Sequence, residues 1–314
     1  MIRAAVPCYS WTVPVSIRLN DPTAVRDLFD RAAEALRSSP YRRGSAVNLP
    51  GRGRLLVTGD LHDNPEHLRK IVRLAGLGES DDHHVILHEI IHGQILVNGV
   101  DLSHRMLARV AQLVVDHPRQ VHVLPGNHEL AQMTGQRVSK GAGDDVALFN
   151  GGLQFAFGDA WEGVSEAIAR FIRAMPLAAR SESGLFCAHS LPAPRMLDAF
   201  DPGILDRELT DRDYRPPDGS AYLLVWGRGW GEREVNVLAA EWNTVLFCLG
   251  HERADNGILM RGPRAIILNS DHEMATVVPI DLADLPSAEG AMHMAVRLGG
   301  VGGVGDVPPM SGPR

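Results

Sequence analysis

Five short apolar runs, each followed at once by Asp, Asn, Glu or His, constrain the fold of this chain most strongly. In the first, Leu55-Leu56-Val57-Thr58-Gly59-Asp60-Leu61-His62, the run ends at a glycine, and an acid and an imidazole follow two residues apart. Such runs are typical of strands buried on both faces. One histidine beside a strand is usually a core residue, but repetition at the same end of successive strands indicates a shared site. The other runs lead to His88-Glu89, Asn127-His128, His189 and His251.

Segments with helical periodicity alternate with these strands. We expect strands over 54–58, 84–87, 121–124, 185–188 and 245–249, and helices from Asp21 to Leu36, over 65–75, from the cap at 101–103 to 115, and over 161–175. This order predicts a largely parallel sheet. Later runs at 257–260, 265–268 and 275–280 are expected to be antiparallel strands that close a second sheet. The prediction is an α/β sandwich of two sheets flanked by helices, with the polar strand ends along one edge.

Three regions follow from composition. Residues 1–50 are expected to be an N-terminal extension with one packing helix, in which the basic loop from Ser38 to Arg54 is a solvated linker. Residues 51–283 form the expected main domain. Residues 284–314 are rich in Gly and Pro, so we expect a flexible tail that buries too little apolar surface to order itself.

Composition excludes several classes of protein. A net charge of −7 over 314 residues argues against a general nucleic-acid binder, which would present a basic face. No apolar run is long enough for a transmembrane helix, and the N-terminus is a poor secretory signal. The three cysteines, Cys8, Cys187 and Cys248, give no disulfide framework, and two lie on expected core strands. We therefore expect a cytoplasmic protein that does not bind a membrane.

The motifs resemble those of the calcineurin-like metallophosphoesterases, in the branch of the phosphoprotein phosphatases, over residues 55 to 280. Gly59-Asp60-Leu61-His62 and Gly126-Asn127-His128-Glu129 match two blocks of that family closely. Later stretches at 185–192, 222–226 and 250–252 are similar to the blocks that follow. Where the family has Gly-Asp-x-Val-Asp-Arg-Gly, this chain has His88-Glu89-Ile90-Ile91-His92-Gly93.

The resemblance implies a site with two metal ions and a hydroxide that bridges them and attacks phosphorus. Glu89 falls where the family has the carboxylate shared by both ions. Carboxylate and imidazole donors suit Mn, Fe or Zn. The implied ligands of the first ion are Asp60, His62 and Glu89, and those of the second are Glu89, Asn127, His189 and His251.

The resemblance also assigns roles around the metals. His128 is implied to protonate the leaving oxygen, and His92 falls where the family has the Asp that orients this histidine. An imidazole stabilises a protonated neighbour less than a carboxylate does, so an activity optimum shifted toward acid is expected. The arginine of the second block is missing, and Pro125 stands where the family has another arginine. Arg228, in a glycine-rich loop, and Arg253 are the candidates to bind phosphate instead.

The expected function is the metal-dependent hydrolysis of phosphate monoesters, with a phosphoprotein or a small phosphorylated molecule as substrate. Two other functions stay open. One is a phosphodiesterase or dinucleotide pyrophosphohydrolase that uses the same metal site. The other is a catalytically weakened relative that binds metal or phosphate, which the altered block around Glu89 suggests.

Overall fold

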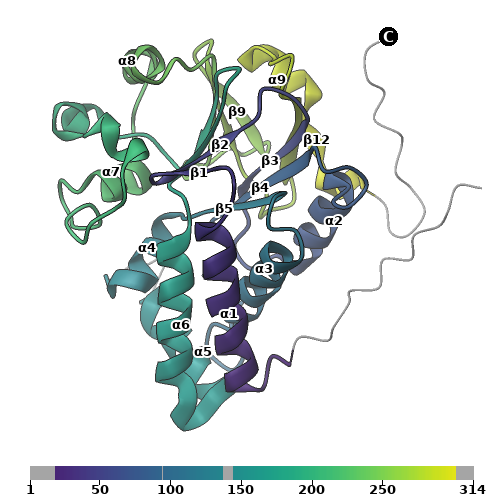
Figure 1. The fold of residues 1–314 in the computed structure, drawn as a ribbon, viewed down its shortest axis with the longest axis vertical. Helices are drawn as coiled ribbons and strands as arrows, with labels where there is room; N and C mark the ends of the chain where they lie inside the picture. The colour runs from purple at the N-terminus through teal and green to yellow at the C-terminus, as the bar shows by residue number, and fades with distance from the viewer. Residues whose placement is uncertain (1–17, 94, 137–143, 302–314) are drawn as a thin grey trace, which may run out of the picture.

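A computed structural model describes residues 18–93, 95–136 and 144–301. Two β-sheets pack face to face, and helices cover the outer face of each (Figure 1). One sheet has five strands in the order β12-β11-β3-β4-β5, and the other has seven in the order β1-β2-β6-β7-β8-β10-β9. The predicted two-sheet α/β sandwich is therefore confirmed.

The five-stranded sheet carries the first three strands predicted from sequence. β3 (Arg54–Asp60), β4 (His83–His88) and β5 (Val121–Leu124) pair in parallel. Parallel pairing makes their carboxyl ends meet at one edge. β11 (Thr276–Asp281) pairs with β3 in the antiparallel sense, and β12 (Val296–Arg297) pairs with β11 in the same sense.

The seven-stranded sheet is mixed. Its strands are β1 (Arg42–Arg43), β2 (Ala46–Leu49), β6 (Ala178–Ser181), β7 (Leu185–Ala188), β8 (Leu246–Leu249), β9 (Ile258–Arg261) and β10 (Ala265–Leu268). The expectation that the last three strands would all be antiparallel members of one sheet is wrong. β10 pairs with β9 in the antiparallel sense but with β8 in parallel, and β11 belongs to the other sheet. Apolar runs specify strands but not their partners.

Helices cover both outer faces. α7 (Ser220–Trp226) and α8 (Glu232–Trp242) pack on the seven-stranded sheet. In Figure 1, α1 and α6 run side by side below the five-stranded sheet. Short 3-10 helices cover Gly158–Ala160, Pro194–Ala199, Pro202–Asp206 and Leu298–Gly300. The helices that pack apolar residues against the five-stranded sheet are α1 (Pro22–Arg37), α2 (Pro65–Ala75), α3 (His104–Asp116), α5 (Asp145–Phe157) and α6 (Trp161–Ala174).

α2 illustrates how local sequence places the turn that follows Asp60. The Asn64 side chain accepts a hydrogen bond from the backbone of His67 at 3.0 Å, and Pro65 occupies the first helical position. Gly76 ends the helix in the left-handed conformation. The predicted bounds of this helix are confirmed.

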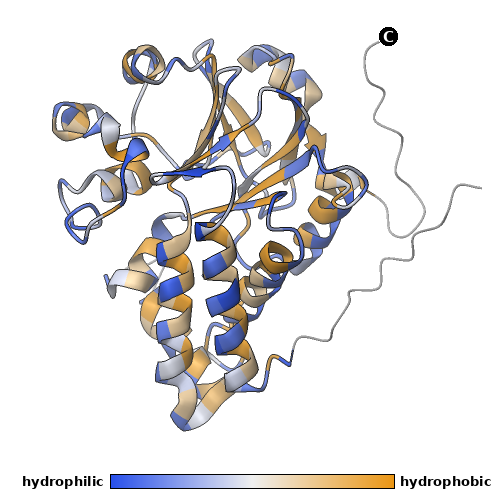
Figure 2. Cartoon of the chain, viewed as in Figure 1, coloured by the Kyte–Doolittle hydropathy of each residue, from blue (hydrophilic) through white to orange (hydrophobic). Residues whose placement is uncertain are grey.

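The central core lies between the sheets. Apolar side chains of both sheets meet there, and Figure 2 shows apolar residues along the strands with polar residues on the outer helix surfaces. Cys187 and Cys248 face each other in register on β7 and β8 as buried free thiols. Cys8 lies outside the described residues.

The expected boundary at residue 50 is not a boundary in the structure. β2 pairs in parallel with β6, and Val47 and Leu49 are buried between the sheets. The expectation of a solvated linker over Ser38 to Arg54 is therefore wrong within 42–49, because a short buried run follows the arginines. The predicted N-terminal helix is confirmed as α1, which packs on α6. Residues 1–17 lie outside the described part of the chain.

The expected flexible tail is also wrong over its first half. α9 (Ala288–Met294) buries Ala288 and Ala291 in the core between the sheets, and β12 pairs with β11. The few apolar residues of this segment are enough to order it, because Ala288 and Ala291 pack into a core that the sheets already form and β12 adds to the edge strand β11. Residues 302–314 lie outside the described part of the chain.

Within the described ranges, none of the helices combines the length and the apolar character needed to cross a bilayer.

Candidate active site

Six side chains proposed as metal ligands come together at the carboxyl ends of the parallel strands. Two groups of three have potential ligand atoms that all lie within 4.8 Å of one another: Asp60, His62 and Glu89 form one group, and Glu89, His189 and His251 form the other. Glu89 belongs to both. A centre with two metals needs such a shared carboxylate. Oxygen and imidazole donors together suit Mn, Fe or Zn.

Glu89 is buried, and each of its two carboxylate oxygens contacts another residue of the site. Its Oε2 lies 2.6 Å from His189 Nε2, and its Oε1 accepts a hydrogen bond from the backbone of His128 at 3.0 Å. Burial opposes ionisation, but the charges of His189 and His128 outweigh it and hold the pKa of Glu89 well below its usual range. The carboxylate is therefore ionised at neutral pH, as a shared metal ligand must be.

The other members of the second group lie close to the Nε2 atom of His189. This nitrogen lies 3.0 Å from Asn127 Oδ1 and 3.0 Å from His251 Nδ1. An amide oxygen, a carboxylate and two imidazoles thus surround one point. Asn127 joins the group because β5 ends at Leu124 and α4 (Asn127–Thr134) begins within one short turn.

The first group depends on the orientation of His62. Its Nδ1 donates to the carbonyl of Ile91 at 3.1 Å, so Nε2 is the nitrogen that would bind a cation. Asp60 accepts from the backbone of His251 at 3.1 Å, and burial raises the pKa of Asp60 to about 7. A cation beside the carboxylate would favour its ionised form.

The backbone is strained where the site residues lie. His62, Glu89, His92 and His251 adopt φ values of 38°, 51°, 58° and 67°. Residues other than glycine rarely adopt this left-handed backbone conformation, and such strain is concentrated at functional sites.

Two glycines allow the close approach of the acids. A Cβ on Gly126 would lie 2.3 Å from Glu89 Oε2, and a Cβ on Gly250 would lie 2.3 Å from Asp60 Oδ1. Both glycines precede predicted ligands in the sequence. Their role is to leave space for carboxylates from other strands.

Glu129, the last residue of the Gly126-Asn127-His128-Glu129 motif, connects the turn after β4 to the turn after β5. Its Oε1 accepts from the backbones of Ile90 and Ile91 at 2.7 and 3.0 Å, and its Oε2 accepts from Gly126 at 2.9 Å. The side chain is fully buried. Glu129 therefore fixes the loop that carries Glu89 and His92. The sequence signal is a Glu three residues after the N-cap residue, Gly126.

His92 and His128 form a hydrogen-bonded pair. Their Nδ1 atoms lie 2.8 Å apart, and His92 Nε2 lies 3.3 Å from Gln132 Oε1. The Gln132 amide donates to Asn150 Oδ1 at 2.9 Å, which directs its oxygen toward His92. His92 Nε2 therefore donates and its Nδ1 accepts from His128. The His128 Nδ1 proton is therefore directed at His92.

A carboxylate that sequence reasoning missed lies beside this pair. Asp145, the first residue of α5, places Oδ2 3.7 Å from His128 Nδ1. Nothing in the local sequence connects it to the site, because α5 reaches His128 only through packing of the helices.

The two candidate arginines have different surroundings. Arg228 donates from Nη1 to the His251 carbonyl at 3.0 Å, so its guanidinium lies at the edge of the second group. Arg253 is 87% exposed and pairs with Asp255 at 2.6 Å, so the structure does not bring it to the site. Arg253 directly follows the Gly250-His251-Glu252 motif, but closeness in sequence does not determine whether its side chain points toward the site or toward solvent.

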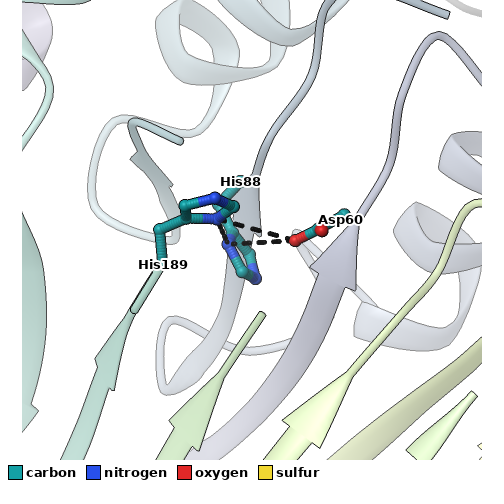
Figure 3. Close-up of side chains that lie close together, drawn as sticks. All are labelled: Asp60, His88 and His189. Atoms are coloured by element: carbon teal, nitrogen blue, oxygen red, sulfur yellow. Dashed lines mark hydrogen bonds and ion pairs between the residues drawn. The ribbon is translucent and has the colours of Figure 1, made fainter. Parts of the chain in front are cut away.

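His88 is a further residue that sequence reasoning left without a role. It ends β4, pairs in register with Asp60 and lies beside His189 (Figure 3). Its Nδ1 lies 3.4 Å from His189 Nδ1 and 4.0 Å from Asp60 Oδ1. Burial lowers the pKa of His88 to about 4, so the ring is neutral at pH 7.

Comparisons with solved structures show a similar fold in known proteins. No curated protein sequence matches the chain. A protein serine/threonine phosphatase from Saccharomyces cerevisiae, described as similar to human phosphatase PP5, shares 17% identity over 83% of each chain with a TM-score of 0.62. A cold-active protein-tyrosine phosphatase of a psychrophilic Shewanella species shares 13% identity over 84% of each chain with a TM-score of 0.52. Both likenesses concern the fold.

The sequence itself carries the family assignment. The model of the calcineurin-like phosphoesterase family matches residues 53–264, a stretch that holds all six ligand candidates. The resemblance inferred from the motifs is confirmed. The chain belongs to the calcineurin-like phosphoesterase family and is a hydrolase acting on phosphoric ester bonds.

Proposed function

We propose that this protein hydrolyses phosphate monoesters at a centre of two metal ions. The observation that carries the proposal is the shared carboxylate of Glu89, which belongs to both groups of potential ligands. Asp60, His62 and Glu89 would hold the first ion. Glu89, Asn127, His189 and His251 would hold the second.

The donor set favours a positively charged centre. Asp60 and Glu89 are the only carboxylates among the six proposed ligands. Two bound divalent or mixed-valence ions, of Mn, Fe or Zn, would supply charge to attract a phosphate dianion and would lower the pKa of water to about 7. The protein's part is to fix ligands, orient the substrate and supply a proton.

His128 is the proposed general acid. Its Nδ1 is engaged with His92, so Nε2 is the atom that would give a proton to the leaving oxygen. Gln132 and His92 act on this step by orienting the ring. Positioned proton transfer of this kind contributes about 100-fold to 10,000-fold to a rate.

Arg228 is the proposed phosphate ligand. Its contact with the His251 carbonyl holds the guanidinium next to the second ion site, and the flanking glycines let the loop approach. Two parallel N–H groups of arginine match the oxygens of a phosphate. Arg253, which is exposed and paired with Asp255, is not part of this proposal.

A phosphorylated protein is the substrate that we favour, and a small phosphomonoester is the alternative. Two solved structures of similar fold are described as protein phosphatases, one for serine or threonine and one for tyrosine. A cytoplasmic location stays a prediction from cysteine usage.

Metal titration combined with a substrate panel tests the proposal. The protein is stripped with a chelator, titrated with Mn²⁺, and assayed on p-nitrophenyl phosphate, a phosphoserine peptide, bis-p-nitrophenyl phosphate and a dinucleotide polyphosphate. We expect two bound equivalents, preference for monoesters, and loss of at least one equivalent in Glu89→Gln. Preference for the diester or the dinucleotide would make the protein a phosphodiesterase or pyrophosphohydrolase. Metal binding without hydrolysis would make it a weakened relative.

A further inference from the structure

His88 is placed to act on a metal ligand although it lies outside the six proposed ligands. It is 2% exposed and ends β4, directly beside Asp60 at the end of β3. Figure 3 shows its ring packed against the ring of His189, with Asp60 facing both. Asp60, His88 and His189 also form a group whose potential ligand atoms lie within 4.8 Å of one another.

The contacts of the His88 ring define which nitrogen carries its proton. His88 Nε2 lies 2.9 Å from the carbonyl oxygen of Thr58. A carbonyl oxygen only accepts hydrogen bonds, so Nε2 is the donor. In a neutral imidazole the other nitrogen is then an acceptor, and His88 Nδ1 therefore presents an electron pair.

That electron pair faces one atom of His189. His88 Nδ1 lies 3.4 Å from His189 Nδ1, so His189 Nδ1 must carry the proton that the two nitrogens share. The opposite nitrogen of His189, Nε2, faces the Glu89 carboxylate at 2.6 Å, and it is the atom that would exchange its proton for a cation. This is the atom around which Glu89, Asn127 and His251 are arranged.

We infer that His88 is a positioning residue that sets the tautomer and orientation of His189 for metal binding. The inference rests on the proposed two-metal centre. Histidines that bind metals usually donate their other N–H to a carboxylate, a backbone carbonyl or a water. Here a backbone carbonyl acts through a second imidazole, so that Thr58 orients His88 and His88 orients His189.

The space around His88 is adapted to this arrangement. A Cβ on Gly250 would lie 2.6 Å from His88 Cε1. The glycine before His251 therefore leaves space for the His88 ring as well as for Asp60. The end of β4, the turn after β8 and the residue after β7 together hold the pair of imidazoles.

Zinc binding to the full chain tests this role. Wild type, His88→Leu and His88→Asn are titrated with zinc against a chelating indicator. Loss of such a partner typically weakens metal binding about 10-fold to 100-fold, so His88→Leu should lose that much affinity for one equivalent and keep the other. His88→Asn should recover most of the loss, because its side-chain oxygen can accept from His189 near the position of Nδ1.

A matched control is His104→Leu. His104 is a buried histidine in α3 whose two ring nitrogens have no hydrogen-bond partner, and it lies among Phe149 and Phe157. This variant should bind zinc as wild type does. Thermal unfolding in chelator shows whether each variant folds without metal.

Three outcomes would overturn the inference. These are unchanged zinc affinity in a folded His88→Leu, failure of His88→Asn to exceed His88→Leu, and a zinc-loaded crystal with an ion about 2.1 Å from His88 Nδ1. Fewer than two zinc equivalents in wild type would instead refute the proposed function itself. The two failures are therefore distinguishable.

Discussion

His92 Nδ1 lies 2.8 Å from His128 Nδ1, and the two rings meet nearly edge to face at an interplanar angle of 77°. An imidazole thus contacts the proposed general acid where the family motif has a carboxylate. Both rings are buried, with exposures of 3%. Gln132 contacts the far side of the His92 ring, with its Oε1 3.3 Å from His92 Nε2.

The effect of His128→Ala should depend on the leaving group. With an alkyl phosphate, turnover should fall about 100-fold or more, because a poor leaving oxygen needs a proton. With p-nitrophenyl phosphate, whose leaving group is stable as an anion, the loss should be several-fold smaller. Steady-state kcat on the two substrates measures the difference. Equal losses would show that His128 does not protonate the leaving group.

Replacement of Asp145 should change the pH profile. The Asp145 carboxylate lies 3.7 Å from His128 Nδ1 and favours the protonated ring. In Asp145→Asn the alkaline limb of kcat should therefore move to lower pH, while metal content stays at the wild-type value. The pH dependence of kcat on an alkyl phosphate measures this shift. A profile that keeps its alkaline limb in place would remove Asp145 from the proposed mechanism.

Arg228→Ala should weaken phosphate binding. A hydrogen bond to a charged group contributes about 1.5–3 kcal/mol, so KM for a phosphomonoester should rise at least about tenfold. The matched control is Arg253→Ala, an exposed arginine paired with Asp255, which should leave KM unchanged. Metal content is measured in both, since Arg228 also contacts the His251 backbone. An unchanged KM in Arg228→Ala would refute the assignment.

Gly250→Ala should disrupt the metal site. The new Cβ would lie 2.3 Å from Asp60 Oδ1, so the carboxylate or the His251 turn must move. We expect at least about a tenfold loss of affinity for one metal equivalent, comparable to the loss of a supporting contact. Gly300→Ala is the control, because nothing lies within 4 Å of a Cβ at that position. Wild-type affinity in both variants would contradict this role of Gly250.

A buried histidine pair away from the site should make the metal-free protein sensitive to acid. His84 Nδ1 lies 3.2 Å from His122 Nε2, and burial lowers the pKa of His122 to about 3. Between about pH 6.5 and 3, His122 is therefore protonated in the unfolded chain but neutral in the folded protein. Stability contributed by the neutral ring is complete above about pH 6.5 and falls as the pH drops toward 3, by up to about 1.4 kcal/mol per pH unit.

Urea unfolding in chelator between pH 7 and 4 measures this slope. The slope should be smaller in His122→Gln than in wild type. His293→Gln, at an exposed position of α9, should keep the wild-type slope. Identical slopes in all three proteins would mean that His122 does not contribute to the acid sensitivity.

Several local elements and the six candidate ligands could be predicted from the amino-acid sequence. α2 begins and ends at the predicted residues because its caps, Asn64 and Gly76, are local features. β5, β7 and β10 also have the predicted bounds, since short apolar runs bounded by polar residues specify strands directly. All six ligand candidates came from motifs at strand ends, and the structure brings them together.

Which distant segments meet depends on how the two sheets and the helices pack. His88 and His189 are 101 residues apart in the chain, and their contact exists because β4 and β7 belong to sheets that pack face to face. Asp145 reaches His128 through helix packing, and α9 is held because the sheets already offer a core for Ala288 and Ala291. Periodicity and capping report on neighbours along the chain, whereas pairing, packing and side-chain direction depend on burial against residues far away in sequence. For that reason the sequence identified which groups could bind metal, and the fold determined how they are oriented.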